Sequence, residues 1–114
     1  MARVLIIDDS PTEVHVLGGM LKKHGYEVIT AETGEEGIEV AKAQKPDLIL
    51  MDIVMPGLNG FQATRAISKD AATKDIPIII VSTKGQETDK IWGMRQGASD
   101  YVTKPASEDE LISK

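Results

Sequence analysis

The chain contains no cysteine, which excludes disulfide bonds and thiolate chemistry and suits a reducing compartment. It also contains no apolar run that approaches the length of a membrane span. The apolar segment at residues 1–7 stops at Asp8, too soon for the core of a signal peptide. We therefore expect a cytoplasmic protein that does not insert into a membrane.

Basic residues are outnumbered by acidic ones, with 13 Lys and Arg against 18 Asp and Glu, giving a net charge of -5. Proteins that bind nucleic acid need a basic surface to displace counterions from the phosphates. We therefore expect no direct contact with nucleic acid.

Length and composition indicate a single folded unit. The chain has 114 residues, of which 41% are apolar and 27% are charged, as is ordinary for a water-soluble globular protein. No repeat, low-complexity tract or interior linker interrupts it. We expect one domain over residues 1–114, large enough for a continuous core.

Five short β-rich segments alternate with helical patterns along the chain, and this alternation predicts an α/β fold with a parallel sheet. The expected strands are residues 3–7, 27–30, 47–51, 76–82 and 100–103. The first, third and fourth are nearly continuous in apolar residues, as strands covered by helices on both faces should be. These three belong at the centre of the sheet.

Several expected helices begin with recognisable capping signals. Residues 10–13 and 33–36 both have the capping-box pattern, in which a Ser or Thr is followed by Glu three positions later. A third helix fits residues 60–69, and a short fourth helix fits residues 86–96. A last helix begins with another capping box at residues 107–110 but is truncated after about two turns, a length that is marginal for a helix on its own.

Acidic residues follow two of the expected central strands. Asp8 and Asp9 end the first strand, and Asp52 ends the third. If these strands are parallel neighbours, the three carboxylates converge at the carboxyl edge of the sheet, where open α/β folds hold ligands. A cluster of oxygen donors favours a hard cation such as Mg²⁺ over zinc. The alternative is that these residues only form turns or helix caps.

The acidic pair, Asp52, Ser82 and the Lys104–Pro105 pair follow one another in an order that resembles the receiver domains of bacterial two-component response regulators. Residues 55–60 resemble the receiver loop after the phosphate-accepting aspartate, and residues 97–105 resemble the fifth-strand block. The resemblance covers essentially the whole chain. It implies the flavodoxin-like, CheY-like fold with strand order 2-1-3-4-5 and helices on both faces of the sheet.

The resemblance implies that Asp52 accepts a phosphoryl group from a sensor histidine kinase in a Mg²⁺-dependent reaction. Asp9, Asp52 and the backbone carbonyl of Ile53 would then bind Mg²⁺ directly, with Asp8 acting through water. Such a domain is not an enzyme acting on outside substrates, because it catalyses only its own phosphorylation and dephosphorylation.

The resemblance also assigns the residues that respond to the phosphoryl group. Lys104 would reach it as a fixed cation, and Ser82 would donate its hydroxyl. Tyr101 would act with Ser82 as a switch that alters the surface of helix 4, strand 5 and helix 5. Lys90 and Met94, together with Tyr101, are the expected partner surface. Trp92 is expected to pack against the sheet as a core residue.

Residues 8–13, 51–65 and 86–90 more narrowly resemble the single-domain receivers of type IV pilus twitching motility. The expected partners are a histidine kinase and a downstream protein target, and the chain should be a monomer or weak dimer. One alternative is the receiver portion of a longer regulator with a DNA-binding or enzymatic output domain. A flavodoxin-like FMN carrier would need a phosphate-cradling loop where this chain has Asp8 and Asp9. A phosphohydrolase would need a lid for which this length has no room.

Overall fold

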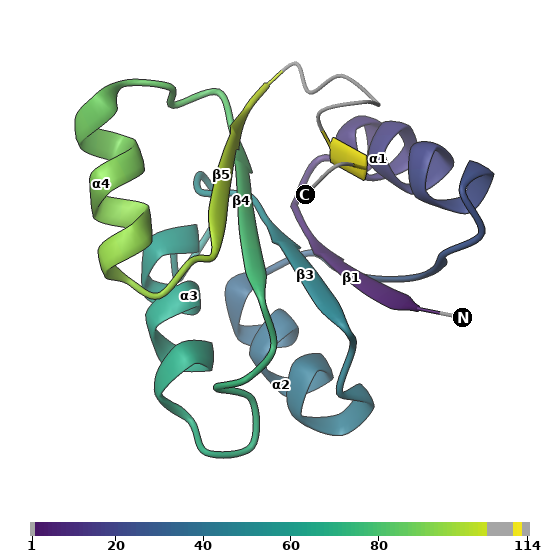
Figure 1. The fold of residues 1–114 in the computed structure, drawn as a ribbon, viewed down its shortest axis with the longest axis horizontal. Helices are drawn as coiled ribbons and strands as arrows, with labels where there is room; N and C mark the ends of the chain where they lie inside the picture. The colour runs from purple at the N-terminus through teal and green to yellow at the C-terminus, as the bar shows by residue number, and fades with distance from the viewer. Residues whose placement is uncertain (1, 105–110, 113–114) are drawn as a thin grey trace.

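The computed structural model describes residues 2–104 and 111–112 of the chain, and it contains a five-stranded parallel sheet (Figure 1). The strands lie in the order β2-β1-β3-β4-β5. Their bounds are β1 Arg3–Ile7, β2 Glu27–Ala31, β3 Leu48–Met51, β4 Ile78–Ser82 and β5 Asp100–Thr103. The expected fold class and strand order are therefore confirmed, with β1, β3 and β4 at the centre.

Four helices connect the strands: α1 Pro11–Lys23, α2 Gly34–Gln44, α3 Gly60–Lys69 and α4 Glu87–Arg95. Helix α1 lies on one side of the sheet with residues 111–112, and α2, α3 and α4 lie on the other (Figure 1). Leu111 and Ile112 are helical and pack in the same core cluster as α1. The expected capping box at residues 107–110 and the position of Pro105 lie outside the described residues.

Successive side chains of the central strands point alternately into two separate apolar cores, one on each face of the sheet. Leu5 and Ile7 of β1 pack in the core beneath α2 and α3, whereas Val4 and Ile6 pack in the core beneath α1. All four side chains are almost completely buried. A strand covered on both faces needs apolar residues at every position, which explains the unbroken run in the sequence.

Strand boundaries agree with the expected ones to within two residues. The largest difference is at β4, which begins at Ile78 although residue 76 was expected. Pro77 has no N–H to offer a ladder, although its carbonyl still accepts a hydrogen bond from Ile49 N (3.0 Å). Backbone N–H groups of β4 therefore take part in strand pairing only after this proline.

Two expected capping boxes are only half formed. Ser10 and Thr33 each accept a hydrogen bond from the backbone N–H three residues later, as expected. The returning bonds are absent: Ser10 N donates instead to Asp8 Oδ1 (2.9 Å), and the carboxylate of Glu36 accepts from Glu32 N (2.8 Å). Among the described helices, a complete box is found at the start of α3, between Asn59 and Gln62.

Helix α4 packs through a glycine, and this makes the expected core position of Trp92 wrong. Gly93 is the buried residue of α4, and a Cβ added there would lie 2.8 Å from Ile80 Cδ1 and 3.2 Å from the Tyr101 ring. Because the helix backbone approaches the sheet this closely, the neighbouring Trp92 is turned outward and is 50% exposed. Ile91 and Met94 are also about half exposed, at 48% and 46%.

Within the described part of the chain, no helix is long and apolar enough to span a membrane.

Candidate acidic site at the carboxyl edge of the sheet

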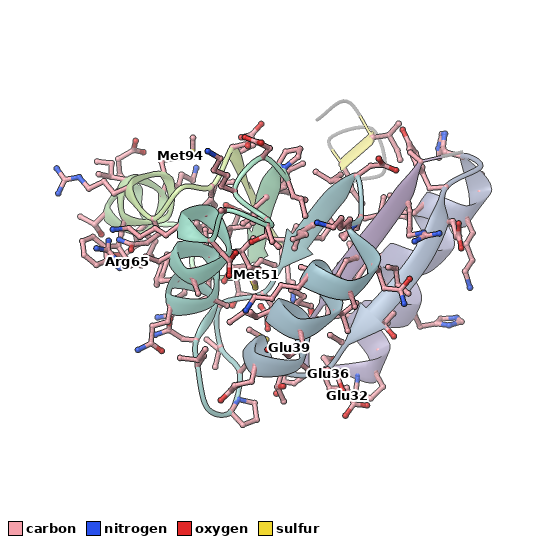
Figure 2. All side chains as sticks on the ribbon, turned by 90° about the horizontal axis from the view of Figure 1, so that it is seen from below. Glu32, Glu36, Glu39, Met51, Arg65 and Met94 are labelled. Atoms are coloured by element: carbon pink, nitrogen blue, oxygen red, sulfur yellow. The ribbon has the colours of Figure 1, made fainter. Side chains whose placement is uncertain are left out.

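The sheet register brings the ends of the central strands to one edge. Ile7 pairs with Met51, so the residues that follow them, Asp8 and Asp52, start from adjacent positions. A hydrogen bond from Asp52 N to the Ile7 carbonyl (2.9 Å) extends this pairing by one step. Figure 2 shows Met51 in the interior of the molecule, and its side chain is completely buried.

Three carboxylates meet at this edge. Asp8, Asp9 and Asp52 each offer an oxygen, and these oxygens all lie within 4.8 Å of one another. Asp8 is buried and held by the hydrogen bond from Ser10 N, Asp52 is partly buried, and Asp9 is exposed. The cluster therefore has a fixed inner side and an open outer side through which a ligand could enter.

Lys104 supplies a cation to the cluster. Its Nζ lies 3.1 Å from Asp8 Oδ2 and 3.5 Å from Asp52 Oδ1, and its side chain is only 10% exposed. Burial alone lowers the pKa of Lys104, but the negative charges of Asp52, Asp8 and Glu13 outweigh burial and leave the pKa raised. The ammonium group is therefore held charged beside the carboxylates.

Asp52 is in an environment that disfavours its ionised form. Burial raises the pKa of Asp52, and the negative charge of Asp8 raises it further. Lys104 and a hydrogen bond from the Ile53 backbone pull the pKa down without cancelling the rise. The cluster thus has more negative charge than its one lysine neutralises, and an added cation would relieve this excess.

The donor set fits a hard divalent cation. The site offers carboxylate oxygens from Asp8, Asp9 and Asp52 and no sulfur or imidazole ligand among the described residues of the cluster. The carbonyl of Ile53 accepts a hydrogen bond from Gly60 N (2.8 Å) and retains a second lone pair. A Cβ on Gly60 would lie only 2.0 Å from the Asp52 carbonyl oxygen, so glycine is required for this loop to fold against the site.

Ser82 is the last residue of β4 and is almost completely buried. Its Oγ accepts a hydrogen bond from Lys84 N (3.1 Å), and its carbonyl accepts one from Lys104 N (2.8 Å). These bonds fix the hydroxyl at the same edge of the sheet as Lys104 and start the loop that leads to α4.

Tyr101 joins β5 to that loop. Its hydroxyl donates a hydrogen bond to the Lys84 carbonyl. Burial raises the pKa of the Tyr101 phenol, and a hydrogen bond with Ser82 opposes the rise. Lys90 and Met94, the other residues of the expected partner surface, lie on α4, where Lys90 is partly exposed and Met94 about half exposed.

The structure adds Glu13, a residue that the sequence interpretation did not include in the site. Its Oε2 lies 3.7 Å from Lys104 Nζ, so Lys104 faces a third carboxylate besides Asp8 and Asp52. In the sequence, Glu13 occupies the last position of a capping-box pattern, and it was therefore interpreted as a helix-capping residue and not as part of the site. Because Asp8 binds Ser10 N instead, the Glu13 side chain is available to the acidic site.

Comparisons with known proteins show the family and the fold of the chain. The model of the response regulator receiver domain family matches residues 4–114. Protein PilH of Pseudomonas aeruginosa is 63% identical over 112 residues, which cover 98% of this chain and 93% of that protein.

Two solved structures extend the comparison. The chemotaxis protein CheY4 of Vibrio cholerae has a TM-score of 0.92 at 32% identity, with 99% of this chain and 94% of that chain covered. The receiver domain of a sensor histidine kinase from Pseudomonas aeruginosa, solved with magnesium coordinated in its active-site cleft, has a TM-score of 0.90 at 31% identity. That alignment covers 98% of this chain and 92% of that chain. The chain therefore belongs to the response regulator receiver domain family, whose members act as phosphoacceptors in two-component signalling.

Proposed function

We propose that Asp52 is the phosphoacceptor and that a histidine kinase is the donor. A carboxylate oxygen of Asp52 attacks the phosphorus of a phosphohistidine, the P–N bond breaks, and the freed imidazole nitrogen takes up a proton. The product is an acyl phosphate on Asp52. The observation that carries this proposal is the position of Asp52, which is partly buried at the strand end, clusters with Asp8 and Asp9 and lies 3.5 Å from Lys104 Nζ.

The acidic cluster is suited to hold Mg²⁺ during this step. Asp9, Asp52 and the Ile53 carbonyl would bind the ion directly, and Asp8, which already binds Ser10 N and Lys104, would act through water. When bound, the ion supplies positive charge that offsets the charge gathered on the transferring phosphoryl group. Burial and then the negative charge of Asp8 raise the pKa of Asp52, and this supports the assignment because a bound cation would favour the ionised carboxylate.

Lys104 and Ser82 are proposed to bind the new phosphoryl oxygens. The Lys104 ammonium is shared among Asp8, Asp52 and Glu13, and a short movement would transfer it to an oxygen attached to Asp52. Ser82 would donate its hydroxyl from the end of β4. A phosphoryl group adds roughly -1.5 to -2 charges, so it can draw both donors inward.

The switch is proposed to act through Tyr101. The loop between Ser82 and α4 carries Lys84, whose carbonyl accepts the Tyr101 hydroxyl. Movement of Ser82 toward the phosphoryl group would shift this loop and with it the packing of Tyr101 against Gly93 of α4. The surface that includes Lys90 and Met94 would change as a result, and a downstream protein would detect that change.

The biological setting is proposed from similarity. The 63% identity to PilH over nearly the whole chain, together with the motif resemblance, supports a role in type IV pilus or chemotaxis-like motility signalling in the cytoplasm. In this role the chain catalyses only its own phosphorylation and dephosphorylation, and its output is the docking of a partner.

The test is incubation with Mg²⁺ and acetyl phosphate, followed by intact-mass measurement. We expect the mass to rise by one phosphoryl group, and we expect no rise with EDTA or in the Asp52→Asn variant. Asp47→Asn is the matched control, because it removes an aspartate at the other end of β3, where Asp47 accepts a hydrogen bond from Arg3 N. Phosphorylation that persists in Asp52→Asn would overturn the assignment.

A further inference from the structure

A groove of about 400 Å³ lies between α3 and α4 and shares no lining residue with the acidic site. It is lined by Asn59, Phe61, Gln62, Arg65, Trp92 and Gln96. Trp92 contributes an indole ring that is half exposed, although large aromatic side chains are usually covered. An exposed aromatic ring beside an arginine and side-chain amides is the composition typical of an interaction hot spot.

The two walls of this groove differ in how firmly they are held. The α3 wall begins with a complete capping box and buries Gly60, Ala63, Thr64 and Ile67. The α4 wall has no side-chain N-cap, and within the helix it buries Gly93 alone. A helix with few buried contacts moves at low cost, so α4 is the wall whose position can change.

The groove also carries a charge opposite to that of the whole chain. Arg65 is the one charged residue among those that line the groove, so the groove is locally positive, whereas the chain has a net charge of -5. Figure 2 shows Arg65 and Met94 at one end of the molecule and Glu32, Glu36 and Glu39 toward the other. Arg65 Nη1 lies 3.4 Å from Gln96 Oε1, a contact that spans the two walls.

The α4 wall is connected to the proposed phosphorylation site by direct packing. The Gly93 backbone lies so close to Ile80 of β4 and to the ring of Tyr101 that an added Cβ would have to displace the end of the Ile80 side chain. Tyr101 in turn donates to the Lys84 carbonyl, in the loop that follows Ser82. A shift of that loop would therefore change the position of Trp92 relative to the fixed α3 wall.

We propose that the α3–α4 groove is a docking site for an acidic segment of a partner protein, with one apolar side chain of that segment packing on Trp92 and its carboxylates facing Arg65. Phosphorylation of Asp52 alters the affinity of the groove for this segment by moving α4. This coupling rests on the proposed function, whereas the docking site does not. The groove is distinct from the surface formed by Lys90 and Met94, which lies on the outer side of α4.

Charge complementarity selects this occupant over the alternatives. A nucleic acid is repelled by the net charge of -5, whereas a short acidic segment interacts mainly with Arg65 because charges beyond about 8 Å are screened at physiological salt. The exposed Trp92 requires an apolar complement, which a purely ionic ligand lacks. A peptide segment that carries both carboxylates and an apolar side chain can pair with Arg65 and pack on Trp92 at the same time.

The probe is a random 12-residue peptide library displayed on phage and selected against the full chain. We expect the enriched peptides to be acidic with one aromatic or aliphatic residue. Trp92 is the only tryptophan, so each synthesised peptide should change the tryptophan fluorescence in a saturable way. Affinity should fall as salt is raised.

Two charge-reversal variants test whether the peptide binds in the α3–α4 groove. Arg65→Glu should weaken binding at least tenfold, and Lys22→Glu, on α1 across the sheet, should leave it unchanged, with both variants melting like the parent chain. Enrichment of neutral or basic peptides would overturn the proposal. It would equally be overturned if Lys90→Glu abolished binding while Arg65→Glu did not, since the occupant would then lie on the outer face of α4.

The coupling to phosphorylation has its own readout. Addition of beryllofluoride with Mg²⁺ should change the peptide affinity at least threefold in the parent chain and not in Asp52→Asn. If acetyl phosphate modifies Asp52 and the affinity stays the same, the coupling is wrong. If Asp52 is never modified but acidic peptides still bind through Arg65, the proposed function fails and the docking site stands.

Discussion

The carboxylate of Glu13 lies 3.7 Å from the ammonium nitrogen of Lys104, so the lysine proposed to bind the phosphoryl oxygens is already shared with a residue of α1. Glu13 is in the first turn of that helix, beside the open side of the acidic cluster. Its negative charge competes with an incoming phosphoryl group for the same cation. Glu13 is therefore expected to restrain phosphorylation.

Replacement of Glu13 by Gln should increase the rate of phosphorylation by acetyl phosphate. A partly exposed ion pair of this kind contributes about 0.2–1 kcal/mol, which corresponds to roughly a 1.4- to fivefold faster reaction. The rate is measured by intact mass over time at fixed Mg²⁺. Glu39→Gln is the matched control because it removes the same charge from the exposed surface of α2, and an equal acceleration there would attribute the effect to net charge alone.

Asp52→Asn should stabilise the metal-free protein. Burial and the charge of Asp8 raise the pKa of Asp52, so the ionised carboxylate costs free energy in the folded state. The gain should be on the order of 1 kcal/mol near neutral pH, a rise of about 5 °C in Tm. Thermal denaturation followed by circular dichroism, with and without Mg²⁺, measures it.

The pH dependence of this gain follows from the sign of the shift. A group whose folded-state pKa is raised contributes its stability below its unfolded pKa and loses it as the pH rises through the folded pKa. The advantage of Asn should therefore disappear below about pH 4, where Asp52 is protonated in both states. A variant that is more stable by the same amount at pH 3 and pH 7 would contradict this explanation.

Two glycine-to-alanine changes should have opposite effects. A Cβ at Gly60 would lie 2.0 Å from the Asp52 carbonyl oxygen, so Gly60→Ala must displace the backbone beside the site. We expect a loss of about 2 kcal/mol or more in the free energy of unfolding, together with slower phosphorylation. At Gly19 a Cβ meets nothing within 4 Å, so Gly19→Ala should stabilise α1 by about 0.5–1 kcal/mol. Urea denaturation and the mass assay test both.

Tyr101→Phe should separate phosphorylation from its structural consequence. The ring that packs against Gly93 is kept, while the hydrogen bond to the Lys84 carbonyl is removed. The phosphorylation rate should stay within about twofold of the parent, a change below 0.5 kcal/mol. In the parent chain, beryllofluoride should shift amide signals across residues 83–101. Shifts of equal size in the variant would argue against a switch role for Tyr101.

Much of the fold follows from local patterns in the sequence. The strands at residues 3–7 and 47–51 are apolar at nearly every position, which requires cover on both faces and hence central places in a parallel sheet. Their acidic ends then fall at one edge by geometry, and the structure brings those carboxylates together with Lys104. The strand order itself depended on family resemblance, because no residue pattern specifies it.

Contacts between residues far apart in the sequence were harder to predict from the sequence. Trp92 was misplaced because α4 packs through Gly93, and a missing side chain leaves no apolar signal in the sequence. The approach of Glu13 to Lys104 was not predicted because it joins residues 91 positions apart (104 minus 13) and depends on Asp8 taking the Ser10 amide. Each error arose where a tertiary contact displaced a local preference.

The proposed phosphoacceptor and its buried acidic neighbour each directly follow a fully buried residue. Asp8 follows Ile7 and Asp52 follows Met51, and both of these apolar residues are 0% exposed. Their backbone positions are therefore set when the protein folds, and little ordering entropy remains to be lost when a donor arrives. A core truncation such as Ile7→Val removes one methylene group and changes no acidic residue. For that reason it should slow phosphorylation of Asp52 before it unfolds the domain.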